Sequence, residues 1–320
     1  MVVILGSIES GLIFAILALG VYLTFRILDF PDLTVDGSFA TGGALAATMI
    51  SGGVSPFVST ISAIGIGLVV GAVTGVLHTK GKINPLLAGI LSMIALYSIN
   101  LRIMQGKANI PLLGQDTIIS QIQDKLASMG NFSLVVSLAI IVLIIKFIID
   151  WFLHTEIGLS IRATGNNPRM IRSFSANTDT TIIVGLSLSN GLVALSGAIY
   201  AQYQGFADIS MGIGMIIIGL ASVIIGEAIF GDRSIVRATF AVIGGAIIYR
   251  LVVALAMREG LAPTDMKLMT ALIVIAALIM PKITSGIRDK KRRANRRKTI
   301  ERALQKSGSP SQAGEVKSNA

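Results

Sequence analysis

Runs of about 20 apolar residues recur along most of this chain, and they restrict its fold more than any other feature. A helix of about that length crosses the hydrocarbon core of a bilayer. Only helices and closed barrels satisfy their backbone hydrogen bonds there. The runs are continuous and lack the apolar–polar alternation of a barrel strand. Charged residues make up 14% of the 320 residues, against roughly 25% in soluble domains. We therefore expect an all-α, polytopic transmembrane helical bundle.

About nine segments are predicted to span the membrane. They cover residues 5–25, 37–50, 57–77, 83–104, 132–153, 180–203, 212–230, 236–256 and 265–280. The second segment is rich in glycine and looks too short to cross as one regular helix. We expect residues 1–281 to form a transmembrane domain. Residues 282–320 are expected to form a basic, partly disordered cytoplasmic tail.

Positive charge is concentrated after the last predicted span. From Pro281 onward there are twelve Lys or Arg and three acids, whereas the whole chain has a net charge of +10. A basic tail is compatible with nucleic-acid binding, but a positive flank that holds the last span's exit in the cytoplasm is the stronger interpretation. Contact with anionic headgroups of the lipid bilayer is expected too. The short-loop cations predict a multi-pass protein of the cell (plasma) membrane, with the N-terminus outside and the C-terminus cytoplasmic.

The inventory of reactive residues excludes several classes of function. There is no cysteine, and the two histidines lie beside predicted helix ends with no metal-binding spacing, so neither thiol chemistry nor a metal site is expected. No GxxxxGK[ST] phosphate-binding loop occurs. We expect no cofactor and no enzymatic activity, and any ATP that drives this protein must bind another polypeptide.

A polar insert of residues 154–179 separates the fifth and sixth predicted spans. Within it, Asn167 and Pro168 are typical of a helix start, with Asn167 as the N-cap and Pro168 at the first helical position. The helix would continue to Phe174 and carry Arg169 and Arg172. A short, basic, partly apolar helix suits docking into a groove of a soluble partner. The alternative is an interfacial helix that only anchors the bundle on headgroups.

The insert also carries a family resemblance. Its run TEIGLSIRATGNNP, residues 155–168, resembles the T-x-x-G-x-x-x-R-A-x-G-x-N pattern of membrane permease subunits of type II ATP-binding cassette importers for branched-chain amino acids and ribose-like sugars. Residues 189–200 (SNGLVALSGAIY) and 37–44 (GSFATGGA) resemble other spans of that family. The likeness extends over about residues 5–285 and is greatest to a branch of permeases assigned to aromatic amino acids.

The resemblance implies a permease subunit that moves a small polar solute, an amino acid above all, by alternating access. Its expected partners are a cytoplasmic ATPase subunit, an extracytoplasmic substrate-binding protein and a second permease copy. The insert would couple the permease to the ATPase. The coupling residues implied are Gly158, Arg162, Ala163, Gly165, Asn166, Asn167, Pro168, Arg169 and Arg172.

The solute pathway is expected at the glycine-rich second segment, as a broken helix whose free backbone groups meet a polar solute. Ordinary close packing of helices through small residues is the alternative. Intramembrane ionisable residues are further candidates, although static pairing of Arg250, for instance with Glu9, is expected more than solute recognition, and Lys146 is expected to snorkel. The candidate pathway residues are Asp36, Ser38, Thr41, Gly42, Gly43, Asn190, Glu227 and Arg250.

An ion-coupled secondary transporter or channel is the competing functional class. It would need its own coupling-ion site, and carboxylates within the predicted spans are sparse, with Glu227 the main candidate.

Overall fold

The computed structural model describes residues 2–125, 132–173 and 177–258, with isolated positions between 268 and 279. The chain divides into two compact units, residues 1–274 and 275–320. Almost all of the second unit, including the expected basic tail, lies outside the described residues, and so does most of the predicted ninth span.

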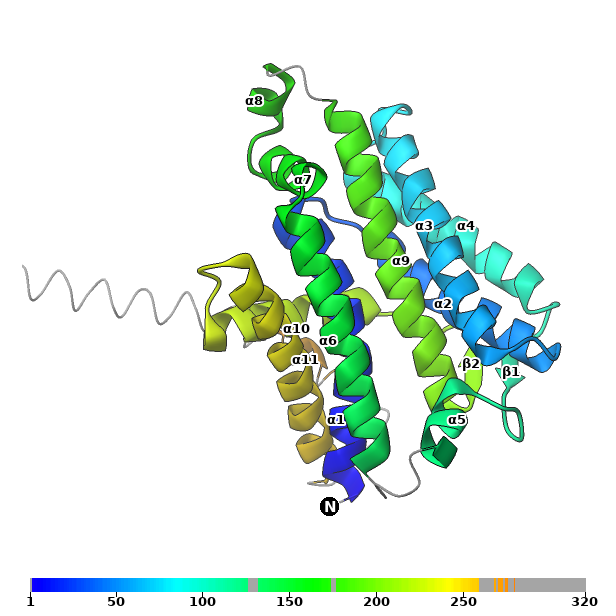
Figure 1. The fold of residues 1–320 in the computed structure, drawn as a ribbon. Coiled ribbons are helices and arrows are strands. Elements are labelled where there is room, and N and C mark those ends of the chain that lie inside the picture. The colour runs from blue at the N-terminus through cyan, green and yellow to red at the C-terminus, as the bar shows by residue number, and fades with distance from the viewer. Residues whose placement is uncertain are drawn as a thin grey trace, which may run out of the picture. The chain divides into compact units, whose positions relative to one another are not determined.

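The first unit is helical, apart from one short pair of strands (Figure 1). Its elements are α1 (Val2–Val21), η1 (Tyr22–Ile27), α2 (Thr34–Ser51), α3 (Pro56–Thr79), α4 (Pro85–Ile103), β1 (Asn109–Pro111), α5 (Ile118–Lys125), α6 (Ser133–His154), α7 (Glu156–Asn166), α8 (Pro168–Ser173), α9 (Thr178–Gln204), β2 (Phe206–Asp208), α10 (Met215–Phe230) and α11 (Ile235–Arg258). The first eight predicted spans therefore each coincide with a helix. The all-α class is confirmed.

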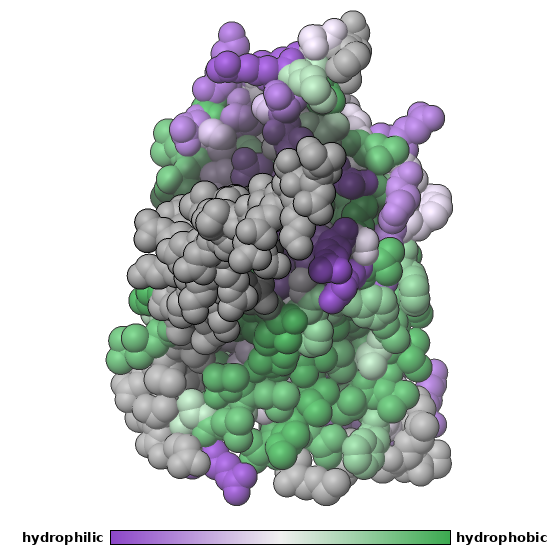
Figure 2. Space-filling model, turned by 90° about the vertical axis from the view of Figure 1, so that its left-hand side faces the viewer, coloured by the Kyte–Doolittle hydropathy of each residue, from purple (hydrophilic) through white to green (hydrophobic). Residues whose placement is uncertain are grey.

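Six of these helices are long and apolar enough to cross a membrane, within the described part of the chain: α1 with η1, α3, α4, α6, α9 and α11. The expected count of about nine is not confirmed. α10 has 16 residues, about 24 Å of helix, which is shorter than a hydrocarbon core of about 30 Å. On the face shown in Figure 2, hydrophobic residues gather over the lower part and hydrophilic residues at the upper end.

The expected break in the second segment is wrong. α2 is a continuous α-helix from Thr34 to Ser51. Its small residues let neighbouring backbones approach, so the alternative of close packing describes it. A Cβ at Gly42 would lie 2.0 Å from the carbonyl oxygen of Ala194 in α9, and a Cβ at Gly197 in α9 would lie 2.0 Å from that of Phe39 in α2. Each helix thus needs a glycine where the other's backbone passes.

α3 packs against α9 in the same manner. A Cβ at Gly67 would lie 2.4 Å from the carbonyl oxygen of Asn190, and one at Gly71 would lie 2.2 Å from that of Leu186. Close approach through small residues is how helices associate where lipid removes the hydrophobic drive. We call α2, α3 and α9 the glycine-packed body. α1, buried along residues 10–23, packs beside it.

Lys146 does not snorkel, contrary to expectation. Its side chain is 0% exposed, its Nζ lies 2.5 Å from Asp150 Oδ2, and it sits 3.7 Å from the centroid of the Phe240 ring. Asp150 Oδ1 also accepts a hydrogen bond from Thr239 of α11. A paired carboxylate one turn along the same helix makes burial of the ammonium possible, and the pair fixes α6 against α11.

The end of the unit opposite α7 and α8 is closed by β1, β2 and α5 (Figure 1). β1 and β2 pair antiparallel, with Ile110 opposite Ala207. α5 is tied to α9, because Gln202 accepts a hydrogen bond from the backbone N–H of Ile118. The segments around β1 and β2, which are far apart in the sequence, thus meet at the same end.

Candidate functional site

The insert between α6 and α9 folds into two helices, α7 and α8, of which the sequence predicted only the second. Thr155 caps α7 by accepting a hydrogen bond from the Gly158 N–H. A Cβ at Gly158 would lie 2.2 Å from the carbonyl oxygen of Phe152, near the end of α6. A Cβ at Gly165 would lie 2.0 Å from the carbonyl oxygen of Ile27, at the end of η1. The two glycines of the motif therefore seat α7 on α6 and on the segment that follows α1.

α8 begins as the sequence predicted. Asn167 Oδ1 accepts a hydrogen bond from the Met170 N–H, and Pro168 is the first helical residue. No residue of α8 is buried. Arg169 is exposed, and the Nε of Arg172 donates to the hydroxyl of Thr178 at the start of α9. The predicted continuation at Phe174 lies outside the described residues. α8 is therefore a basic helix at one end of the unit that the described part of the chain does not bury.

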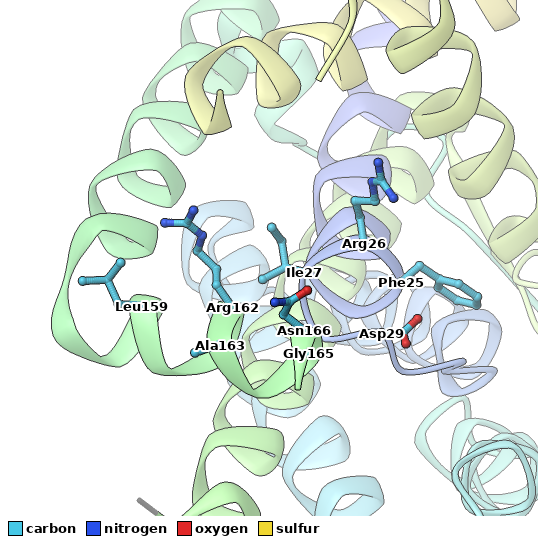
Figure 3. Close-up of a pocket in the computed structure, with 9 residues that line it drawn as sticks. All are labelled: Phe25, Arg26, Ile27, Asp29, Leu159, Arg162, Ala163, Gly165 and Asn166. Atoms are coloured by element: carbon cyan, nitrogen blue, oxygen red, sulfur yellow. The ribbon is translucent and has the colours of Figure 1, made fainter. Parts of the chain in front are cut away.

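A cleft of about 640 Å³ separates α7 from η1 and the residues after it. Its lining comprises Phe25, Arg26, Ile27, Asp29, Leu159, Arg162, Ala163, Gly165 and Asn166. Figure 3 shows the side chains of Arg162 and Arg26 on opposite sides of Ile27. Arg162 makes no hydrogen bond or ion pair with the residues that the structure describes. Its guanidinium is available to a carboxylate, which it can bind in bidentate fashion.

Arg26 connects this cleft to α10. It lies in η1, a turn of π-helix that ends α1, and π-helical turns are frequent at functional sites. Its Nε lies 2.8 Å from Glu227 Oε1 and its Nη2 lies 2.8 Å from Asp232 Oδ2. Glu227, a predicted pathway residue, is therefore paired with a cation at the α7 end of the unit.

Two other predicted pathway residues, Ser38 and Asn190, meet in a buried network that the sequence did not predict. Asn190 Oδ1 accepts from the Ser38 hydroxyl at 2.6 Å, and its Nδ2 donates to Asp32 Oδ2 at 2.7 Å. Asp32 is 0% exposed and also accepts from the Thr34 N–H. Burial raises the pKa of the Asp32 carboxyl, and the bonds from Thr34 and Asn190 oppose that rise. The network joins the connector before α2 to the middle of α9.

Asp36 caps α10, which is far away in sequence. Its two carboxylate oxygens accept from the N–H groups of Gly214 and Ile216, at 2.9 and 2.8 Å. An acidic cap also complements the positive end of the helix dipole. The same side chain lines a second pocket, of about 330 Å³, beside α4.

The other predicted pathway residues have partners inside the helix packing. Thr41 donates to the carbonyl of Gly37 in its own helix, and Gly43 faces Met211. Arg250 Nε donates to Ser10 Oγ, and its guanidinium lies 4.6 Å from the Phe14 ring centroid. The suggested Glu9–Arg250 pair does not form, because Glu9 instead accepts from the Tyr203 hydroxyl.

The structure thus gathers the predicted coupling residues at one end, whereas neither of the two pockets described here is lined by more than one of the predicted pathway residues. Among them, only Asp36 lines the 330 Å³ pocket. Asp32, Arg26 and Asn100 of α4 were not among the site residues predicted from the sequence. The described residues hold no cluster of three or more His, Cys, Asp or Glu that could bind a metal.

Residues 3–280 match a model of the protein family described as branched-chain amino acid transport system / permease component. The chain is 44% identical over 275 residues to the tyrosine transport system permease protein of Clostridioides difficile, covering 86% of this chain and 90% of that protein. It is 29% identical over 250 residues to the ribose import permease protein RbsC of Haemophilus influenzae, covering 77% and 74%. It is 27% identical over 271 residues to the galactofuranose transporter permease protein YtfT of Escherichia coli, covering 83% and 75%. No solved structure matches.

Proposed function

We propose that this chain, which belongs to the family of branched-chain amino acid transport system permease components, carries an amino acid through the membrane by ATP-driven alternating access. Members are membrane permeases of type II ATP-binding cassette importers. They are not enzymes, because a separate subunit hydrolyses the ATP, and a substrate-binding protein serves them. Family membership and the six long apolar helices make this chain a multi-pass membrane protein.

The observation that carries the coupling proposal is the seating of α7. It contacts α6 at Gly158 and the end of η1 at Gly165, so a push on α7 reaches two membrane helices, α6 and α1, together. α8 follows α7 directly and buries none of its residues. We infer that the ATPase subunit holds α8 and the Arg162 cleft, and that closure of the ATPase moves α7 as a lever.

The lever acts on a network that extends into the body. The segment after Ile27 leads to Asp32, which is hydrogen-bonded to Asn190 in α9. Arg26, beside the same contact, is paired with Glu227 and Asp232 around the end of α10. Rigid helices joined by such contacts move as units and not by bending. Movement of α7 would therefore rock α1, α9 and α10 in one step, which is the motion that alternating access requires.

The distribution of cations supports a cytoplasmic position for α7 and α8. Arg26 and Arg162 lie in the cleft, Arg169 and Arg172 lie on α8, and Lys80 lies 3.7 Å from Asp179 at the start of α9. Positive loops stay on the cytoplasmic side. We therefore propose that the N-terminus is outside and the C-terminus inside.

An amino acid is the proposed solute because the relative with 44% identity is named for tyrosine transport, whereas the relatives named for sugars are at 27–29%. We further propose that two copies of this chain pair as a homodimer. Exposed apolar side chains on α4 and α10, among them Leu91, Ile94, Tyr97 and Ile217, offer a surface for such pairing.

Ion coupling is disfavoured by the way the buried acids are used. Asp32 is bound by Asn190 and the Thr34 N–H, and Asp150 by Lys146 and Thr239. A coupling-ion site needs ligands that the resting protein leaves available.

The test is reconstitution of the chain with a candidate ATPase and binding protein in liposomes, with uptake of labelled L-phenylalanine as the readout. We expect uptake that requires ATP. Arg162→Gln should weaken co-purification of the ATPase, whereas Arg102→Gln, at the other end of the unit, should not. Uptake driven by an ion gradient without ATP would refute the proposal, and undiminished ATPase binding by Arg162→Gln would refute the coupling site.

A further inference from the structure

We propose that the pocket between α2, α4 and the segment leading into α10 binds the amino group of the transported solute. This inference rests on the permease function proposed above and adds where, and through which chemical group, the solute is held. The pocket has a volume of about 330 Å³. Asp36, Asn100, Met93, Tyr97, Ile209 and Ile213 form the part of its lining used below.

Asn100 is the first reason to assign a ligand to this pocket. Its side chain is 1% exposed, and its buried Oδ1 accepts no hydrogen bond from any residue that the structure describes. Other buried side chains nearby are satisfied; Thr74, for example, donates to Ser92 between α3 and α4. A buried carbonyl left without a donor costs free energy, so a native protein keeps one only where something else supplies the donor. A ligand with N–H groups would do so.

Asp36 supplies the charge. Its carboxylate is held in place by the N–H groups of Gly214 and Ile216, one to each oxygen. A carboxylate oxygen accepts more than one hydrogen bond, so both remain able to receive another donor. No Lys, Arg or His is among the described residues that line the pocket. Two acceptors, one of them anionic, without a cation select an ammonium group.

The rest of the pocket suits an apolar or aromatic body. Met93 and Tyr97 of α4 stand on one side, and Ile209 and Ile213 before α10 on the other. A volume of about 330 Å³ is at the lower end of the range for small-molecule sites, which matches a single amino acid. The solute class is therefore a small primary amine with an apolar or aromatic side chain. A sugar, which has no ammonium group, would leave Asp36 without a counter-charge.

The absence of cysteine makes a direct test simple. Ser98 lines the pocket and is exposed, so Ser98→Cys places a unique thiol there; Ile99→Cys, next to it but outside the lining, is the matched control. The rate of labelling by a neutral maleimide is measured on the permease–ATPase complex in nanodiscs. The additions are L-phenylalanine, phenethylamine, which lacks the carboxylate, and 3-phenylpropionate, which lacks the amino group.

We expect L-phenylalanine and phenethylamine to slow labelling of Ser98→Cys, and 3-phenylpropionate to leave the rate unchanged. Labelling of Ile99→Cys should respond to none of them. Equal protection by 3-phenylpropionate, or no protection by either amine, overturns the inference. This assay needs no transport, so it gives a result even if the complex imports nothing.

A second variant tests Asn100 itself. Because Oδ1 has no partner among the described residues, Asn100→Leu leaves no other polar group unsatisfied and should preserve the fold, which the unfolding temperature of the purified variant checks. We expect uptake of L-phenylalanine to fall roughly tenfold to a hundredfold, the cost of losing a hydrogen bond to a charged group. If the wild-type complex imports L-phenylalanine and Asn100→Leu imports it equally well, the inference is overturned but the permease function stands. Failure of wild-type uptake in every reconstitution counts against the permease function alone.

Discussion

Glycine has opposite roles in two regions of this molecule. One is the glycine-packed body of α2, α3 and α9, and the other is the layer formed by α7 and α8. In the body, glycines such as Gly42 and Gly197 face each other's helices on both sides of one interface, so that α2 and α9 are locked along their length. In the layer, Gly158 and Gly165 give α7 two points of contact, and α8 buries nothing. An element that transmits force must be in firm contact with the membrane helices, as α7 is, and must leave a surface exposed to the ATPase, as α8 does. The difference between the two regions is therefore one of function.

The largest effect on stability is expected at the buried ion pair of Lys146 and Asp150. Asp150→Asn would leave the Lys146 ammonium buried without its counter-charge, which should lower the free energy of unfolding by about 3–5 kcal/mol. The exposed pair between the end of α3 and the start of α9 provides the control, because Lys80→Met breaks the contact with Asp179 at a cost of about 1 kcal/mol or less. Thermal unfolding of the purified variants measures both. Equal losses of stability in Asp150→Asn and Lys80→Met would show that the buried pair is no more important for folding than the exposed pair.

Next is the packing of the body. Gly197→Ala would place a Cβ 2.0 Å from the carbonyl oxygen of Phe39, a backbone atom that cannot move without shifting α2. We expect a loss of about 3 kcal/mol. Gly65→Ala in α3, where nothing lies within 4 Å, should be neutral or slightly stabilising. The measurement is the fraction of each variant that stays monodisperse on heating. Equal fractions for Gly197→Ala and Gly65→Ala would contradict the close packing of α2 against α9.

The same change in the layer should affect coupling more than folding. Gly165→Ala would push α7 away from Ile27. We expect the unfolding temperature to fall less than in Gly197→Ala, and ATP-driven uptake to be largely lost. Glu156→Ala, at the exposed start of α7, serves as the control and should retain uptake. Normal uptake by Gly165→Ala would mean that α7 transmits nothing through this contact.

The smallest effect compares two helix caps. Asn167→Ala removes the cap of α8. Asn84→Ala removes the cap of α4, because the Asn84 side chain accepts a hydrogen bond from the Leu86 N–H. Each loss should cost about 1 kcal/mol. In α8 we expect it to appear as an approximately fivefold weaker affinity for the ATPase, and in α4 as a lower unfolding temperature with that affinity unchanged. The reverse result would mean that α8 does not contact the ATPase.

Sequence reasoning predicted what depends on local patterns. Long apolar runs predicted the helices, and the cap at Asn167 followed by Pro168 predicted α8, because both signals are contained in a few consecutive residues. Prediction from the sequence failed where the environment of a side chain depends on a helix that is distant in the sequence. Lys146 was expected to reach out to water because its contact with Phe240, and the bond from Thr239 to Asp150, require α6 and α11 to be side by side.

The candidate sites show the same limit. The motif glycines were predicted as coupling residues through resemblance, but the reason for them, contact with Phe152 and Ile27, needed the fold. Asp32 was not predicted as a site residue, because nothing nearby in the sequence indicates its bond to Asn190. Asn100 lay unnoticed in an apolar run. An amide side chain inside a predicted span, between the apolar Ile99 and Leu101, was the signal that could have identified it.

The account depends most on the position of α7 and α8 inside the cell, in contact with an ATPase. In this cysteine-free chain, Arg169→Cys places a thiol on α8, and Leu113→Cys places one at the opposite end, where the residue is 91% exposed. Labelling of intact cells with a membrane-impermeant maleimide should modify Leu113→Cys alone. In inverted vesicles, Arg169→Cys should react, and added ATPase subunit should protect it. Labelling of Arg169→Cys from outside intact cells would contradict both the orientation and the coupling role.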